Sequence, residues 1–122
     1  MSKLEPHRVL VTGGRTYSDR TRVAWALKAV DAKYPIGMVI QGGARGADEL
    51  CKRWAQDNGV YCRQFDADWN SQPRSGGHIR NADMLRVGQP DFVVAFEGGA
   101  GTASMIKMAR KAGVPVWEVP PR

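Results

Sequence analysis

The chain has 122 residues, the length of one ordinary domain, and 43% of them are hydrophobic, which is enough for a core and excludes a disordered chain. The net charge of +6 permits attraction to nucleotides or nucleic acid, but the basic residues form no run of five or more, so a nucleic-acid tract is not indicated. Because no apolar run is long enough to span a membrane and no signal peptide is visible, we expect a cytoplasmic protein without membrane association.

The cysteine and histidine side chains indicate no metal chemistry. Cys51 and Cys62 have no recognisable ligand spacing, and we interpret them as packing residues. His7 and His78 are far apart in sequence, so a zinc site has little support. We therefore expect neither a metal nor a cofactor.

Strands and helices alternate along the chain. Short apolar runs predict strands at about 8–12, 38–41, 60–65, 92–96 and 114–119. Apolar residues at helical spacing predict helices at about 19–33, 45–58, 78–87 and 101–112. Either Ser18 or Asp19 is expected to cap the first helix. This alternation predicts an α/β sandwich with a mainly parallel five-stranded sheet, in one domain spanning 1–122 with its core at about 8–119.

The fourth predicted strand breaks into a glycine turn that opens the last helix. Residues 92–96 form a continuous apolar run, as expected for a parallel strand covered on both faces. The turn contains Gly98, Gly99 and Gly101, which let a ligand approach the backbone closely. Thr102 lies in the first helical turn, where free N–H groups favour an anion. We therefore predict a phosphate-bearing ligand at this turn.

Glycine pairs also end the first two strands, at Gly13-Gly14 and Gly42-Gly43. Right-handed crossovers place the C-terminal ends of parallel strands at one edge of the sheet. Ligands of such sheets bind at that edge, where the strand order reverses. We therefore expect the three glycine turns to meet around one crevice.

Polar residues beside the first two turns are candidates for ligand contact. Thr12 and Arg15 can reach the crevice, although Arg15 is alternatively a solvated loop charge. Arg45 follows the second glycine pair and can place its guanidinium on a phosphate. Asp48 either compensates the dipole of the helix that it begins or contacts a ribose hydroxyl.

The longest connection, residues 66–77, and the helix after it provide further candidates. Arg80 and Asn81 either belong to an exposed first turn or reach the ligand, with Asn81 holding a loop or a sugar hydroxyl. Tyr17 and Trp69 either stack on a base and ribose or cover the loops and core. The predicted ligand-binding residues are Thr12, Gly13, Gly14, Arg15, Gly42, Gly43, Arg45, Gly46, Asp48, Arg80, Asn81, Gly98, Gly99, Gly101 and Thr102.

Taken together, these motifs resemble the YspA-type (DUF2493) branch of the SLOG superfamily, which also contains LOG-type phosphoribohydrolases and DprA-like proteins. The resemblance covers about 8–119 and rests on residues 12–15, 42–48, 67–69, 79–81 with 84–85, and 98–102. It implies a Rossmann-like three-layer sandwich that binds a nucleotide or nucleotide-derived ligand, as a sensor, sequestering or signalling protein of a phage or bacterium. It also implies a homodimer or larger homo-oligomer. Single-stranded DNA, the ligand of the DprA group, gains some support from the net charge but is not favoured.

The same resemblance suggests an alternative function, a nucleoside 5′-monophosphate phosphoribohydrolase that cleaves the N-glycosidic bond. The LOG motif Pro-Gly-Gly-x-Gly-Thr-x-x-Glu supplies a catalytic Glu, and an upstream Arg assists. Arg80 stands where that Arg is expected, but Met105 occupies the Glu position and Glu97 the Pro position. The catalytic candidates are therefore Arg80 and Glu97, with Asp48 as a substitute carboxylate.

Overall fold

The computed structural model describes residues 5–68, 70, 71 and 76–121 and contains a five-stranded, all-parallel sheet. The strand order is β3-β2-β1-β4-β5. The strands are β1 (His7–Thr12), β2 (Ile36–Gln41), β3 (Tyr61–Gln64), β4 (Phe92–Ala95) and β5 (Val116–Glu118). The helices are α1 (Arg20–Lys33), α2 (Ala47–Asp57), α3 (Gly76–Arg86) and α4 (Ala100–Lys111). The predicted Rossmann-like α/β sandwich is confirmed.

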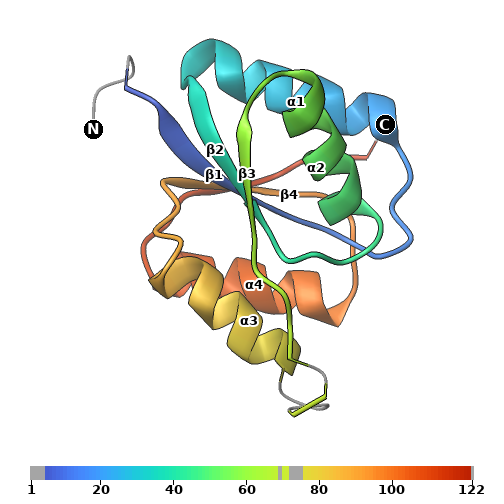
Figure 1. The fold of residues 1–122 in the computed structure, drawn as a ribbon, viewed down its shortest axis with the longest axis vertical. Coiled ribbons are helices and arrows are strands. Elements are labelled where there is room, and N and C mark those ends of the chain that lie inside the picture. Colours follow the sequence, from blue (N-terminus) through green and yellow to red (C-terminus); the bar gives the residue numbers. More distant parts are fainter. Residues whose placement is uncertain (1–4, 69, 72–75, 122) are drawn as a thin grey trace.

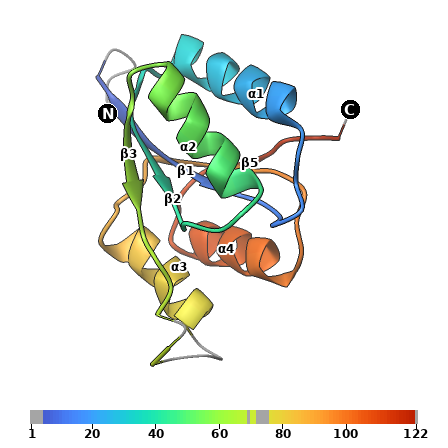
Figure 2. The same cartoon turned by 45° about the vertical axis from the view of Figure 1, so that its right-hand side comes forward.

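Two helices cover each face of the sheet. Figures 1 and 2 show α1 and α2 on one face and α3 and α4 on the other. Successive strand residues point to opposite faces. Val93 accordingly packs in one apolar cluster with Met105 and Ala109 of α4, whereas Val94 packs in the other with Leu27 of α1. Both valines are fully buried, which confirms that β4 is covered on both faces.

Local signals set the ends of the helices. Asp19 is the cap of α1, because its Oδ1 accepts a hydrogen bond from the backbone N–H of Arg22 at 3.0 Å. Gly59 and Gly113 follow α2 and α4 with φ values of 66° and 79°. This left-handed conformation ends a helix and is adopted most readily by glycine.

The observed boundaries differ from the predicted ones at β2 and α3. β2 begins at Ile36 rather than at about 38, because Ile36 already pairs with the first residue of β1. Gly37 is therefore a strand residue that lies against Pro6. α3 begins at Gly76, inside the stretch predicted as a connection, and Gly76 is buried against the backbone of Asp68.

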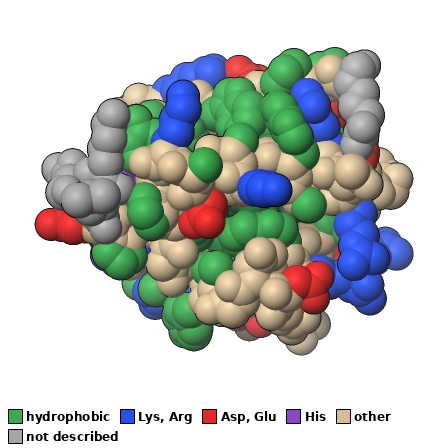
Figure 3. All heavy atoms as spheres, turned by 90° about the horizontal axis from the view of Figure 1, so that it is seen from above, with side chains coloured by type: hydrophobic (Ala, Val, Ile, Leu, Met, Phe, Trp, Pro, Cys, Tyr) green, Lys and Arg blue, Asp and Glu red, His purple; other side chains and the backbone are tan. Residues whose placement is uncertain are grey.

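Within the described part of the chain, no helix combines the length and the apolar character needed to cross a bilayer. On the face seen in Figure 3, Lys and Arg side chains gather at the right edge, and others stand singly between hydrophobic and polar surface.

Met105 tests how strongly α4 depends on its packing against the sheet. Its side chain is fully buried in a cluster with Leu10, Met84 and Val93. We expect Met105→Ala to lower the free energy of unfolding by about 2–5 kcal/mol, because truncation leaves a cavity. Urea denaturation measures this change. Met108→Ala, at a half-buried position of the same helix, should cost about 1 kcal/mol or less, and equal losses would contradict the packing described.

Candidate functional site

Three loops at the C-terminal edge of the sheet meet at Gly14. The backbone N–H of Gly14 donates to the Glu97 carbonyl at 2.8 Å, and the Gly14 carbonyl accepts from the Ala47 N–H at 3.2 Å. The loops lie on the same side of the sheet in Figure 1. β1 and β4 are neighbours where the strand order reverses. The predicted meeting of the glycine turns is therefore confirmed. The loops are residues 13–19, 42–46 and 96–99.

The three loops border a cavity of about 340 Å³, which we term the central crevice. Three polar side chains that line it, Asp48, Asn81 and Thr102, are each only 7% exposed. Since buried polar groups need partners, the crevice is an organised polar site rather than a gap in apolar packing. Its lining residues are Thr12, Gly13, Gly14, Arg15, Ala44, Asp48, Arg80, Asn81, Met84, Gly99, Ala100, Gly101 and Thr102.

Asp48 lines the crevice from the first turn of α2. Its Oδ2 accepts hydrogen bonds from the backbone N–H groups of Gly42 at 3.2 Å and Ala44 at 3.3 Å. The carboxylate therefore organises the loop after β2. Burial raises the pKa of Asp48 from 3.8 to about 6, against the opposing effects of these N–H groups and of Arg80. A carboxyl group with this pKa can exchange a proton near neutral pH.

Arg80 and Asn81 connect α3 to the other walls of the crevice. The Arg80 guanidinium donates to the carbonyl of Gly42, and its Nε donates to Asn81 Oδ1 at 2.9 Å. Asn81 Nδ2 lies 3.5 Å from the Gly101 carbonyl of α4. Burial lowers the pKa of Arg80, whereas the Asp48 carboxylate raises it. The alternative of an exposed first turn is wrong for Asn81, which is buried and holds Arg80 and α4 in place.

α4 begins at the crevice without a capping side chain. Its N-cap is Gly99, which makes no side-chain hydrogen bond. The first N–H groups of a helix have no intrahelical partner, and they lie at the positive end of its dipole. A Cβ added at Gly99 or Gly101 would meet no atom within 4 Å, and the φ of Gly99 is −97°. Neither packing nor a left-handed backbone therefore requires glycine at these two positions.

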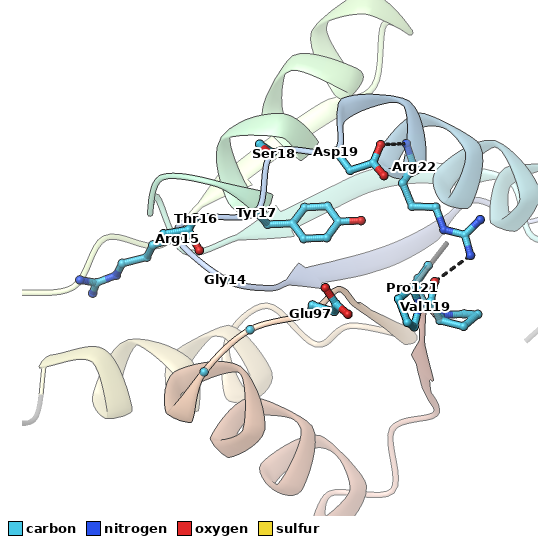
Figure 4. A pocket seen from close by; sticks show the side chains of 13 residues that line it. Gly14, Arg15, Thr16, Tyr17, Ser18, Asp19, Arg22, Glu97, Val119 and Pro121 are labelled. Atoms are coloured by element: carbon cyan, nitrogen blue, oxygen red, sulfur yellow. Dashed lines mark hydrogen bonds between the residues drawn. The ribbon is translucent and has the colours of Figure 1, made fainter.

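A larger cavity of about 560 Å³, which we term the tyrosine pocket, adjoins the crevice. The Tyr17 ring packs on Phe96 with 5.1 Å between centroids. Figure 4 shows that Tyr17 and Glu97 border this pocket, while Arg15 points away from the tyrosine ring. The lining residues that both cavities share are Gly14, Arg15 and Gly99.

The C-terminal segment forms one wall of the tyrosine pocket. Arg22 of α1 donates from Nη2 to the Pro120 carbonyl at 2.7 Å (Figure 4), and its guanidinium carbon lies 4.1 Å from the centroid of the Trp25 ring. The Val119 N–H donates to the Ala95 carbonyl at 2.8 Å. The segment is thus attached both to α1 and to β4.

Most of the predicted ligand-binding residues lie together. Those that line the central crevice are Thr12, Gly13, Gly14, Arg15, Asp48, Arg80, Asn81, Gly99, Gly101 and Thr102. Of the remainder, Tyr17, Glu97 and Gly98 line the tyrosine pocket, and the exposed Arg45 lines a separate cavity beside the loop after β2. Trp69 lies outside the described residues.

The glycines of the loop after β2 have packing roles. Gly42 leaves room for the Arg80 guanidinium, which a Cβ would approach to 2.5 Å. Gly43 and Gly46 have φ values of 72° and 77°, and a Cβ on Gly46 would collide with the Gly14 carbonyl. Close approach and backbone conformation therefore explain these three glycines without a ligand.

The two predicted catalytic residues are not brought together. Glu97 is exposed and lines the tyrosine pocket, whereas Arg80 lines the crevice. Met105, at the position of the LOG glutamate, is fully buried in the core. Asp48 is the carboxylate that shares the crevice with Arg80, and their charges interact.

The crevice also contains residues that the sequence did not single out as ligand contacts. Met84 provides apolar lining, although the sequence marked it only as an apolar residue of the helix predicted at about 78–87. Ala44 and Ala100 line the crevice too. Neither carries a chemical group that marks it in the sequence, so the geometry of the loops was needed to find them.

The charges of the crevice suit an anion better than a cation. Within the described residues, no three His, Cys, Asp or Glu side chains group as a metal site. Among those residues, Asp48 is the one carboxylate lining the crevice, and Arg80 and Arg15 act on it electrostatically. The lining of the crevice therefore combines two arginines and the N-terminus of α4 with a single acidic group.

The fold and this site define a Rossmann-like α/β protein with a polar crevice at the switch point of its sheet. A model of the family described as "YspA, cpYpsA-related SLOG family" matches residues 7–71, and the chain belongs to this family. The "Gene 61 protein" of Mycobacterium phage D29 is 40% identical over 117 residues, which cover 89% of this chain and 93% of the phage protein. No solved structure matches the chain significantly. Membership of the SLOG family suggests a nucleotide-related ligand.

Asp48 should make stability fall as the pH rises. Between about pH 4 and 6 the folded state keeps the Asp48 proton, because its pKa is about 6 there, whereas the unfolded state, with a pKa near 3.8, has lost it. The free energy of unfolding should therefore decrease across this window, by about 3 kcal/mol from this group, and then stay level. Asp48→Asn should remove this decrease and be the more stable protein at pH 7.

Urea denaturation at pH 4, 5, 6 and 7 measures the effect. Asp57→Asn is the matched control, because Asp57 is an exposed residue of the same helix whose side chain is 67% accessible. This control should keep the pH dependence of the wild type. An Asp48→Asn variant with the wild-type pH dependence would contradict the assigned burial of the charge.

Proposed function

We propose that the central crevice binds a nucleotide or nucleotide-derived ligand, with a phosphate on the N-terminus of α4. The observation that carries the proposal is the open space at Gly99 and Gly101, which line the crevice although packing does not require glycine there. Gly101, unlike the N-cap residue Gly99, lies within α4, where glycine costs about 0.5–1 kcal/mol relative to alanine. Room for a ligand at the helix N-terminus explains why this cost is tolerated.

Charge and hydrogen-bonding groups around the crevice support the same ligand class. Arg80 and Arg15 offer guanidinium donors, which bind phosphate oxygens in charge-assisted hydrogen bonds. Asp48 and Asn81 offer polar groups suited to ribose hydroxyls. Tyr17, in the adjoining tyrosine pocket, offers a ring for a base. In this proposal the ligand spans both cavities through their shared lining.

The proposed role is that of a sensor, a sequestering protein or a signalling protein. A single nucleotide-binding domain with its core at about 8–119, acting in the cytoplasm as a homodimer or larger homo-oligomer, is part of the same proposal. The name of the phage relative, "Gene 61 protein", states no activity. The choice among these roles therefore depends on the identity of the ligand.

Gly101→Ala separates a ligand role from a structural one. We expect this variant to be more stable than the wild type by about 0.5–1 kcal/mol, because alanine favours the helix and the added methyl meets no protein atom within 4 Å. We expect it to bind nucleotides at least tenfold more weakly, because the methyl group occupies the ligand's space. Calorimetry with AMP, other nucleoside phosphates and ADP-ribose derivatives measures the affinity.

Ser104→Ala is the control, since it raises helix propensity in α4 at a residue that does not line the crevice. It should keep the affinity of the wild type. Equal binding by the Gly101→Ala variant and the wild type, or no binding of any tested nucleotide at micromolar concentration, would contradict the proposal.

A second candidate function is hydrolysis of the N-glycosidic bond of a nucleoside 5′-monophosphate. The observation in its favour is the buried Asp48 carboxyl group, with a pKa of about 6, beside Arg80 in one crevice. In this reaction Asp48 accepts a proton from a water molecule that attacks C1′, and the C–N bond breaks with its electrons on the base. Asp48 then returns this proton to the departing base, directly or through water, which regenerates the carboxylate. The products are the free base and ribose 5-phosphate.

Chromatography of AMP incubated with the protein tests this candidate by the release of free adenine. We expect Asp48→Asn to reduce the rate at least 100-fold, because it removes the proton acceptor. Asp57→Asn should leave the rate within about twofold, because Asp57 is an exposed residue of α2 that lines neither cavity. No adenine release by the wild type, or an active Asp48→Asn variant, would reject this mechanism.

A further inference from the structure

A cavity of about 340 Å³ lies at the edge of the sheet opposite to the central crevice, and we term it the histidine pocket. His7 and Phe92, the first residues of β1 and β4, line it. Thr12, the last residue of β1, lines the central crevice instead. The two cavities therefore lie at opposite ends of the same strand. The lining residues of the histidine pocket are His7, Val9, Val30, Tyr34, Asp91, Phe92 and Pro115.

His7 places a polar side chain in a core position of β1. Alternate strand residues point to the same face of a sheet, so His7 shares its face with Val9 and Val11. Both valines are fully buried in the cluster that contains Leu27 of α1. His7 itself is only 8% exposed, and its backbone N–H donates to the Pro35 carbonyl at 2.7 Å. The backbone thus fixes this residue, and its imidazole lies in apolar surroundings.

The imidazole of His7 has a nitrogen without a hydrogen bond. Its Nδ1 is buried and has no partner among the described residues. The nearest aromatic ring, that of Tyr34, meets the imidazole edge-on with 5.4 Å between centroids. Buried polar atoms without a partner lower stability and are uncommon in folded proteins. Rotation of the imidazole about Cβ–Cγ exchanges Nδ1 with Cδ2, so that the nitrogen can meet a ligand on either side of the ring.

Aromatic and aliphatic side chains form most of the remaining lining. Tyr34, which follows α1, stacks on Phe92 with 6.5 Å between centroids and 27° between planes. Val30 and Pro115 add aliphatic surface. Together with the imidazole of His7, these rings offer both faces and edges to a planar aromatic molecule. The lining therefore favours an aromatic ligand.

Asp91 is the one Asp, Glu, Lys or Arg among the described residues that line the pocket. Its Oδ2 accepts from the backbone N–H of Arg8 at 2.9 Å, and its Oδ1 lies 3.9 Å from a guanidinium nitrogen of Arg8. The carboxylate already has these partners, and its negative charge opposes the entry of an anion. The histidine pocket thus favours an uncharged molecule, in contrast to the central crevice.

We propose that the histidine pocket binds a small uncharged phenol, whose ring packs against Tyr34 and Phe92 and whose hydroxyl group forms a hydrogen bond with Nδ1 of His7. A hydroxyl group suits either tautomer of histidine, because it donates to a bare nitrogen and accepts from one that carries hydrogen. A carbonyl group suits only one tautomer. This inference is independent of the proposed nucleotide site, because the central crevice and the histidine pocket share no lining residue.

The test compares p-cresol with p-xylene, in which a methyl group replaces the hydroxyl group. Two-dimensional NMR of isotope-labelled protein gives both affinities and the residues whose signals shift. We expect p-cresol to bind with a Kd of about 1 mM or lower and to shift the signals of His7, Tyr34 and Phe92. We expect p-xylene to bind roughly tenfold more weakly, because it leaves Nδ1 without a partner. Benzoate, an anion of similar size, should not bind.

His7→Phe keeps a ring beside Tyr34 and removes the nitrogen. This variant should bind p-cresol and p-xylene equally, and its urea midpoint should not fall below that of the wild type, because an unpartnered polar atom is gone. His78→Phe is the matched control, since His78 is exposed on α3 and does not line the pocket. It should keep the preference for p-cresol. The comparison of the two ligands on the wild type tests the hydroxyl group even if His7→Phe does not fold.

Several outcomes would overturn the inference. They are no binding of p-cresol, signal shifts centred on the central crevice, and equal binding of p-cresol and p-xylene by the wild type. A preference for p-cresol that survives in His7→Phe would also overturn it. Tighter binding of N-acetyltyrosine amide than of p-cresol would reject a free phenol and assign the pocket to a tyrosine of a partner protein. AMP binding is measured separately, so failure of the nucleotide site leaves each of these results unchanged.

Discussion

The candidate site depends on the backbone of one residue, Gly14. Its N–H and carbonyl groups bond the loop after β4 and the start of α2, so that three loops from separate strands have a common point of attachment. These bonds use backbone atoms, which leaves the side chains around them available for chemistry. The central crevice and the tyrosine pocket share Gly14 in their lining. A shift of this residue would therefore change both cavities.

Several residues that line the central crevice lower the stability of the folded state. Asp48 is buried with a raised pKa, and Arg80 is half-buried with a lowered pKa, and burial is the main cause of both shifts. Gly101 adds the cost of glycine in a helix without a packing benefit. Residues that reduce stability tend to concentrate at functional sites. Asp48, Arg80 and Gly101 are three such residues, and all three line the central crevice, which is why we propose the function there.

Much of the architecture could be predicted from the sequence, because alternating apolar runs and helical spacing define a parallel α/β sheet, and such a sheet brings its loops to one edge. The positions of individual side chains could not. Arg45 follows a glycine pair just as Arg15 does, yet it lines a different cavity. The left-handed conformations of Gly43 and Gly46 on either side of it redirect the chain, and the sequence pattern does not specify them. Glu97 likewise follows its strand closely, and its carbonyl accepts the hydrogen bond from Gly14. Its residue nevertheless lines the tyrosine pocket and not the central crevice.

The attachment of Pro120 to Arg22 has a practical consequence for how this protein is handled. The last described residues are a structural wall of the tyrosine pocket, so a tag or reporter joined after them would emerge at the rim of that cavity. The beginning of β1 lies at the opposite edge of the sheet, where Pro6 packs on Gly37, and Figure 1 shows β1 starting on the other side of the molecule from the last described residues. Fusions for nucleotide-affinity measurements and surface immobilisation therefore belong at the N-terminal end.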